Sequence, residues 1–238
     1  MYNDAYSSQN NANVQAGLNA YISKVFGTMF LGLLVTALSA LFVATNETMM
    51  RIFYGNSLVF VMLIVELVIV FALSARIQKI SYATAQLMFY VYAIVNGITL
   101  ASIFYVYEIG TIYTSFFTTA ISFGVMSIYG MVTKKDLTRI GSILMMLLVG
   151  VLVASVINMI LGFFINTQQF DLIISFVAVA VFVGLVAYDT QKLKSYYYSS
   201  LNDYQMQRKI GIIGALSLYL DFINIFLYLL RIFGNKRD

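Results

Sequence analysis

Two acidic residues in apolar surroundings have the type and placement to carry chemistry. Asp221 lies near the centre of the apolar stretch LSLYLDFINIFLYLL, and Asp189 ends the preceding apolar segment in VAYDTQKLK. An ionised carboxylate in hydrocarbon costs roughly 2.5–3.5 kcal/mol on insertion scales, so we expect Asp221 to face the protein interior or water. Acidic residues in such positions typically mark an ion or proton path.

The helix predicted around Asp221 has one small and polar face. Five residues recur at the spacing i, i+3, i+7, i+10 and i+14, which defines one side of a helix: Gly214, Ser217, Asp221, Asn224 and Tyr228. Leucine, isoleucine and phenylalanine cover most of the remaining surface. A helix of this kind is typical of the middle of a bundle, where small residues allow neighbouring backbones to approach closely.

Asp189 and Asp221 are candidates for an interacting pair, although their spacing leaves open whether they touch. The connection between their helices is predicted to be cytoplasmic, and the helix rise from Ile210 to Asp221 is about 16 Å, so both carboxylates fall in the cytoplasmic half. Two facing carboxylates resist double ionisation, and such a pair could titrate near neutral pH. With Ser217, Asn224, carbonyls and water they could also form a weak Ca²⁺ site, and weak binding suits conduction.

Arg76 and Glu66 are the further candidates, and both lie in or beside the second apolar segment. Arg76 follows that segment at its predicted cytoplasmic end, and its planar guanidinium could bridge the two aspartates as a latch. Glu66 lies ten residues earlier on a different helix face, so it would serve another part of the path. Plainer interpretations remain: Arg76 as an orientation signal, Glu66 as a packing group and Asp189 as an interfacial charge.

Seven apolar stretches predict an all-α membrane protein. Of the 238 residues, 61% are hydrophobic and only 10% are charged, which excludes a water-soluble globule. A bilayer core needs roughly 20 apolar residues of helix, whereas barrel strands would alternate over about 10 residues. We expect a polar flexible tail at 1–24, one transmembrane domain at 25–233 and a short tail at 234–238. The predicted spans are Val25–Ala44, Leu58–Ala75, Ala83–Tyr107, Ile112–Val132, Ile140–Ile165, Leu172–Tyr188 and Ile210–Leu230.

The residue types that are missing exclude several classes of function. The chain has no His, Cys, Trp or Pro, which excludes disulfides, Cys/His zinc sites, thiol nucleophiles and His-based triads. Its net charge of +4 is small and scattered, so we expect no nucleic-acid partner. No Gly-rich active-site motif accompanies the two aspartates, and we expect neither enzyme activity nor a bound cofactor.

The distribution of basic residues predicts a cytoplasmic N-terminus. With seven spans, ten of the 14 lysines and arginines fall on the side of the N-terminal tail, and four fall on the other side. Three of those four cluster near the C-terminus, which leaves open a re-entrant seventh segment. Its 21 apolar residues are long enough to cross, so we favour a span.

The C-terminal third resembles the signature of the Bax inhibitor-1 family. The resemblance lies in GALSLYLDFINIFLYLLRIFG at 214–234, and AYDTQ at 187–191 matches the family's second marker. The length, the seven segments and the short N-terminal tail are similar to the bacterial branch over essentially the whole chain. The resemblance implies six helices wrapped around a central seventh, in the bacterial inner membrane.

The resemblance also implies a pH-sensitive calcium leak, with Ca²⁺ as the transported ion. The family's two sensor aspartates correspond to Asp189 and Asp221, its latch arginine to Arg76 and the acid of its second helix to Glu66. Protonation of the pair would weaken its attraction to Arg76 and favour opening. Bacterial relatives are also linked to a membrane-anchored AAA protease. A non-transporting regulator of such a protein and a proton-coupled small-solute transporter remain the alternatives.

Overall fold

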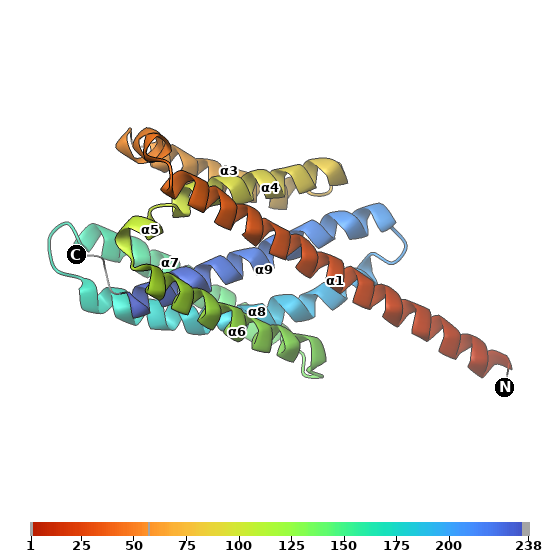
Figure 1. The fold of residues 1–238 in the computed structure, drawn as a ribbon. Coiled ribbons are helices and arrows are strands. Elements are labelled where there is room, and N and C mark those ends of the chain that lie inside the picture. Colours follow the sequence, from red (N-terminus) through yellow and green to blue (C-terminus); the bar gives the residue numbers. More distant parts are fainter. Residues whose placement is uncertain (1, 57, 235–238) are drawn as a thin grey trace.

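The protein is a bundle of long α-helices (Figure 1). The computed structural model describes residues 2–56 and 58–234, with side chains from residue 13 onward. Within this part of the chain there is no β-strand, and seven helices are long and apolar enough to cross a membrane. The predicted all-α fold class is therefore confirmed. The elements are α1 (Tyr2–Ala44), α2 (Glu47–Met50), the π-helical turn η1 (Arg51–Gly55), α3 (Leu58–Arg76), α4 (Tyr82–Leu100), α5 (Ile103–Val106), α6 (Ile109–Val132), α7 (Thr138–Leu161), α8 (Gln168–Ser199) and α9 (Tyr204–Phe233).

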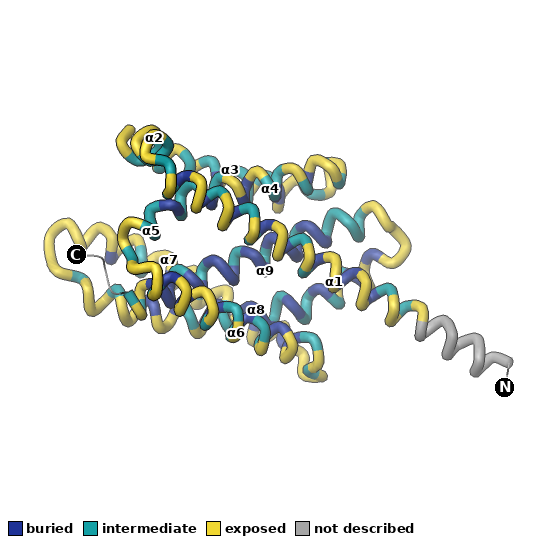
Figure 2. The backbone as a smooth tube through the Cα atoms, in the orientation of Figure 1, coloured by how far each residue is buried: buried dark blue, intermediate teal, exposed yellow. Residues whose placement is uncertain are grey.

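Helix α9 is the most buried of the seven long helices. In its most apolar stretch 61% of the residues are buried, against 11–39% in the others, and Figure 2 shows buried residues along most of its length. It packs mainly against α1, α4, α6 and α8, whereas α3 packs mainly on α4 and α7 mainly on α8. We therefore describe α9 as a core helix with four main neighbours, rather than the six that the family resemblance implies.

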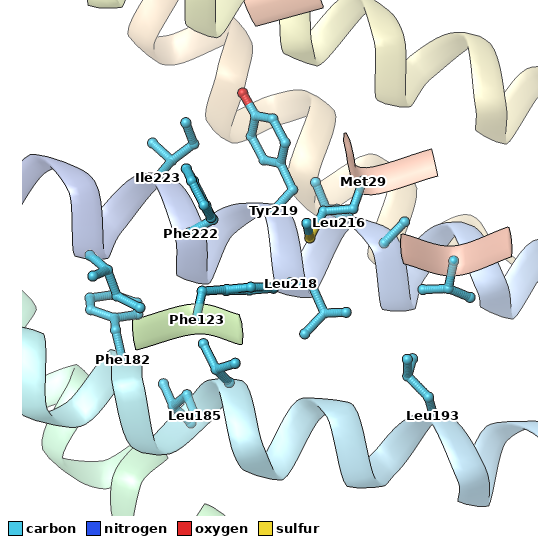
Figure 3. Close-up of a cluster of buried hydrophobic side chains, with 14 of the residues drawn as sticks. Met29, Phe123, Phe182, Leu185, Leu193, Leu216, Leu218, Tyr219, Phe222 and Ile223 are labelled. Atoms are coloured by element: carbon cyan, nitrogen blue, oxygen red, sulfur yellow. The ribbon is translucent and has the colours of Figure 1, made fainter. Parts of the chain in front are cut away.

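The apolar core forms along α9 (Figure 3). Phe222 of α9 meets Phe123 of α6 with ring centroids 5.6 Å apart, and Leu218 is fully buried. The outer helices show the opposite pattern, since Phe71 of α3 is 71% exposed and Met146 of α7 is 68% exposed. Large apolar side chains on the outer surface are expected where lipid is the solvent.

Helix α8 continues eleven residues beyond the predicted end of its span, from Tyr188 to Ser199. The stretch between the predicted sixth and seventh spans, 189–209, is therefore mostly helical, and only residues 200–203 separate α8 from α9. The extension is helical because it has packing partners: Leu193 lies against Gly214 of α9, and Tyr197 lies against Tyr21 of α1. As a result Asp189 lies inside a helix rather than at its end.

The third predicted span, at 83–107, is divided into α4 and α5 near Ala101. The hydroxyl of Tyr54 lies 2.8 Å from the carbonyl oxygens of Ile98 and Thr99, and it accepts a hydrogen bond from the backbone amide of Ser102 at 3.1 Å. A side chain inserted into the backbone ladder in this way interrupts a helix without proline.

The chain ends also differ from the predictions. Of the segment predicted as a flexible tail, 1–24, residues 2–24 belong to α1, and Leu18, Tyr21 and Ile22 are buried against the rest of the bundle. Helix α9 is continuous, which argues against a re-entrant seventh segment, because re-entry would need a turn within it. Of the predicted C-terminal tail, Gly234 follows α9, and residues 235–238 lie outside the described residues.

Candidate functional site

Asp189 of α8 and Asp221 of α9 lie within about one helical turn of each other along the bundle axis. The two helices are antiparallel, and a Cβ atom on Gly214 would come within 2.5 Å of a methyl group of Leu193. Asp221 is seven residues further along α9, which places it opposite Val186 of α8 and about 4.5 Å along the axis from Asp189. At this separation the two carboxylates are close enough for an electrostatic interaction.

Asp221 is buried and incompletely hydrogen-bonded. It is 4% exposed, and among the described residues its Oδ2 has no hydrogen-bond partner. The same is true of Oγ1 of Thr190, which follows Asp189, and of Oγ of Ser127 on α6. Buried polar atoms without partners are rare in native proteins and call for a functional or solvent-based explanation. A proton, a water molecule or a cation would provide the missing contacts.

Small residues on α6 and α7 hold the turn of α8 that carries Asp189. A Cβ on Gly130 would come within 2.3 Å of the carbonyl oxygen of Ala187, and one on Gly141 would come within 2.4 Å of the Tyr188 ring. These glycines therefore let α8 approach both helices more closely than any other residue would allow. Ala187 and Tyr188 of the AYDTQ sequence have a packing role beside Asp189.

Gln191 of the same sequence fastens the connection between α6 and α7 onto α8. Its Oε1 accepts a hydrogen bond from the backbone amide of Leu137 at 2.9 Å, and its Nε2 donates to the carbonyl oxygen of Lys135 at 2.8 Å. Lys194 adds a hydrogen bond to the carbonyl oxygen of Met131. No role for Gln191 was predictable from the sequence, because its partners lie more than 50 residues away along the chain.

Lys192 is the cation whose charge acts on Asp189. It lies three residues along the same helix face, and its ammonium group lies 5.4 Å from the ring centroid of Tyr188 and 5.5 Å from that of Tyr196. Sequence reasoning missed it, although the i, i+3 spacing from Asp189 was a visible signal.

Arg76, the predicted latch, is exposed at the end of α3. Within the described part of the chain it forms no ion pair with Asp189 or Asp221. Helix α3 packs mainly on α4, not on α8 or α9. The latch contact is therefore absent from this conformation.

Glu66 belongs to a different buried network, which joins α1, α3, α4 and α9. Its two carboxylate oxygens accept hydrogen bonds from Asn96 Nδ2 at 3.1 Å and from Thr99 Oγ1 at 2.7 Å. Asn96 Oδ1 accepts a hydrogen bond from the Tyr219 hydroxyl at 2.9 Å, and that hydroxyl lies 2.6 Å from Thr36 Oγ1. Both oxygens of Glu66 have partners, which favours its interpretation as a packing group.

Ser217 and Asn224 are partly buried on α9, and Asn224 Nδ2 donates to the carbonyl oxygen of Leu220 at 2.8 Å. Across the described residues, no group of three or more acidic, histidine or cysteine side chains is placed to hold a metal ion. Ca²⁺ prefers six to eight oxygen ligands. Two carboxylates with a few neutral oxygens therefore suit the passage of a cation better than its retention.

A cavity of about 1190 Å³ lies at the end of the bundle away from Asp189, beside the starts of α6 and α8 and the end of α9. Glu108 and Asp171 contribute acidic groups to its lining. Asp171 accepts a hydrogen bond from Asn158 Nδ2 at 2.7 Å and lies 3.8 Å from the Arg231 guanidinium. The cavity is a polar vestibule at the end of the bundle away from Asp189.

Comparison with known proteins places this site in a family context. The family described as "Inhibitor of apoptosis-promoting Bax1" matches residues 18–238. The chain is 44% identical to "Inner membrane protein YbhL" of Escherichia coli (strain K12) over 225 residues, which cover 94% of each chain. It is 39% identical to a Borreliella burgdorferi protein over 92% of this chain and 94% of the relative, and 35% identical to a Rickettsia prowazekii protein over 98% and 96%.

Proposed function

Because the chain belongs to the Bax inhibitor-1 family, we propose that this integral membrane protein is a pH-sensitive calcium leak channel. The observation that carries the proposal is the buried Asp221 carboxylate, which has an oxygen without a hydrogen-bond partner among the described residues. This carboxylate is also close enough to Asp189 for an electrostatic interaction. We place the protein in the bacterial inner membrane, as the name of the Escherichia coli relative supports, with its N-terminus in the cytoplasm.

The gate responds to the shared charge of the aspartate pair. When the pair is ionised, a nearby cation attracts it and holds the helices together. Lys192 acts on Asp189 from within α8, whereas Arg76 becomes a latch between helices if the end of α3 moves inward. A charge-assisted hydrogen bond contributes roughly 1.5–3 kcal/mol, so protonation of the pair changes the open population by about tenfold to a hundredfold.

The cation path in this proposal runs from the polar vestibule to the aspartate pair. Glu108 attracts cations at the vestibule, where Asp171 is paired with Arg231, and Asp221 of α9 and Asp189 of α8 provide oxygen ligands further into the bundle. Between these levels Phe116 packs on Phe222 and Phe226, with ring centroids 5.7 and 6.5 Å apart. These rings form an apolar contact between α6 and α9, and in this scheme the described conformation is the closed one.

The proposal is tested with purified protein in liposomes that contain a Ca²⁺-sensitive dye. Wild-type protein should admit Ca²⁺ faster as the pH falls through neutrality, because protonation releases the gate. Asp221→Asn and Asp189→Asn should each remove that pH dependence. A pH profile that survives unchanged in Asp221→Asn rules out the sensor role, and solute accumulation driven by a pH gradient would instead indicate a proton-coupled transporter.

A non-transporting regulator is the second candidate, favoured by the two outer helices. Only 11% of the most apolar stretch of α3 and of α7 is buried, so each offers a long apolar face to another membrane protein, such as a membrane-anchored AAA protease. This function predicts a stable complex with that protein and no Ca²⁺ flux in liposomes. It also predicts that Asp221→Asn leaves complex formation intact.

A further inference from the structure

A separate cavity of about 280 Å³ lies between α1, α4, α8 and α9 at the predicted cytoplasmic end. Three of its lining residues, Lys24, Tyr82 and Arg208, come from different helices. Each stands at or just before the start of the apolar stretch of its helix. The cavity is therefore at the level where phospholipid headgroups meet the hydrocarbon core.

The lining of this cavity is basic and aromatic. Lys24 and Arg208 are its charged residues, and none of the lining residues is acidic. The Arg208 guanidinium lies 3.8 Å from the ring centroid of Tyr82 and 5.7 Å from that of Tyr204, and the Lys24 ammonium lies 5.8 Å from the Tyr82 centroid. These rings are already in contact with the protein's own cations, which disfavours a quaternary ammonium ligand and favours an anion.

Two polar groups in the lining lack acceptors. The hydroxyl of Tyr21, a residue only 8% exposed, has no hydrogen-bond partner among the described residues, and neither has Nε of Arg208. Both groups are donors, so they need oxygen atoms from a ligand or from solvent. A phosphate group offers several acceptor oxygens and a charge opposite to that of Arg208 and Lys24.

We propose that this cavity binds the phosphate of an anionic phospholipid from the cytoplasmic leaflet. Basic pockets between transmembrane helices on that side are suited to anionic headgroups. A zwitterionic headgroup would place its own cation beside Lys24 and Arg208, so the cavity discriminates against it. The bound headgroup links α1 to α4 and α9 at their cytoplasmic ends, and this role does not depend on the leak proposed above.

The test uses the full-length chain in detergent, with phosphatidylglycerol, phosphatidylcholine or inorganic phosphate added separately. Native mass spectrometry measures bound lipid, and thermal unfolding measures the stabilisation that each addition produces. Phosphatidylglycerol should bind in preference to phosphatidylcholine. Lys24→Gln and Arg208→Gln should each reduce that preference by roughly fivefold, which is the effect of one basic side chain near an anionic surface.

Two further variants separate ligand binding from general effects. Tyr21→Phe should weaken the binding of phosphatidylglycerol without lowering the Tm of the lipid-free protein, because it removes a hydroxyl that has no partner among the described residues. Arg139→Gln removes an exposed cation on the same predicted side but outside the cavity, and should leave the preference unchanged.

Three results would overturn the proposal. The first is equal binding of both lipids by wild-type protein. The second is an unchanged preference in Lys24→Gln together with unchanged phosphatidylglycerol binding in Tyr21→Phe, and neither variant depends on whether Arg208→Gln folds. The third is a response to inorganic phosphate as large as that to phosphatidylglycerol, which would assign the cavity to a soluble anion.

Discussion

The backbones of α6 and α8 touch where Gly130 meets Ala187, so closely that a Cβ on residue 130 would lie 2.3 Å from the Ala187 carbonyl oxygen. This contact lies two residues before Asp189 in the sequence. The distance between α6 and the turn of α8 that contains Asp189 is therefore set by Gly130 of α6, which has no side chain. The contact between Gly214 and Leu193 does the same between α9 and α8.

Gly130→Ala should destabilise the protein by about 1–3 kcal/mol, because the added methyl group meets backbone atoms that cannot rotate away. Thermal or denaturant unfolding in detergent measures the change. Gly124→Ala on the same helix is the matched control, since a Cβ there has no atom within 4 Å. Equal stability of the two variants would contradict the close packing described for α6 and α8.

Tyr219→Phe should destabilise the protein by about 1–2 kcal/mol, because it leaves the buried Asn96 Oδ1 without its hydrogen-bond donor. Tyr113→Phe on the exposed surface of α6 should have almost no effect on the free energy of unfolding. The pH profile of Ca²⁺ entry should be the same in both variants, since this network shares no hydrogen bond with Asp189 or Asp221. A changed profile in Tyr219→Phe alone would mean that the two sites are coupled.

Gln191→Ala should speed hydrogen exchange at the Leu137 amide, because that amide loses its acceptor. The Thr138 amide provides an internal control, since it donates to Asp136 Oδ1 and not to Gln191. Hydrogen exchange resolved to single residues should show faster exchange at Leu137 and little change at Thr138. Unaltered protection at Leu137 would show that Gln191 does not hold this connection.

Asp136→Asn provides the acidic control for the pH experiments. Hydrogen bonds from the side chain and backbone of Thr138 lower the pKa of the exposed Asp136 carboxyl. Its folded-state pKa therefore lies below the unfolded value of about 3.9. Its contribution to stability is present above the unfolded value and is lost as the pH falls through the folded one.

Because Asp136 stays ionised from about pH 5 to 8, Asp136→Asn should leave the pH profile of Ca²⁺ entry unchanged over that range. The measurement is the same dye assay that is used for Asp221→Asn. A profile that changes equally in both variants would indicate a general charge effect rather than titration of the buried pair.

Lys192→Gln and Arg76→Gln separate the two candidate cations. A nearby cation favours the ionised form of a carboxylate, so Lys192→Gln should move the midpoint of the leak profile toward alkaline pH. A latch stabilises the closed state only while the pair is ionised, so Arg76→Gln should raise Ca²⁺ entry at alkaline pH and flatten the pH profile. The same dye assay, run across the pH range, measures both, and Lys79→Gln is a control for lost charge near the end of α3. If neither variant differs from wild type, the gate does not use these cations.

The membrane architecture could be predicted from the sequence, because it depends on local composition. Seven apolar stretches of sufficient length require seven helices in a bilayer, whatever their neighbours are. The polar stripe around Asp221 likewise predicted a core helix, and α9 is the most buried helix of the bundle. Helix ends were less well predicted, because the extension of α8 to Ser199 depends on packing by Leu193 and Tyr197.

The tertiary structure decided which residues come together at each site. Sequence spacing suggested Asp189 and Asp221, but the packing of Leu193 against Gly214 brings them within about one helical turn of each other. The sequence could not indicate that Arg76 is exposed while Lys192 acts on Asp189. Nor could it indicate that Lys24, Tyr82 and Arg208 share a cavity. The hydrophobic length of a helix is a property of that helix, whereas its register against a neighbour depends on side-chain shapes contributed by distant parts of the chain.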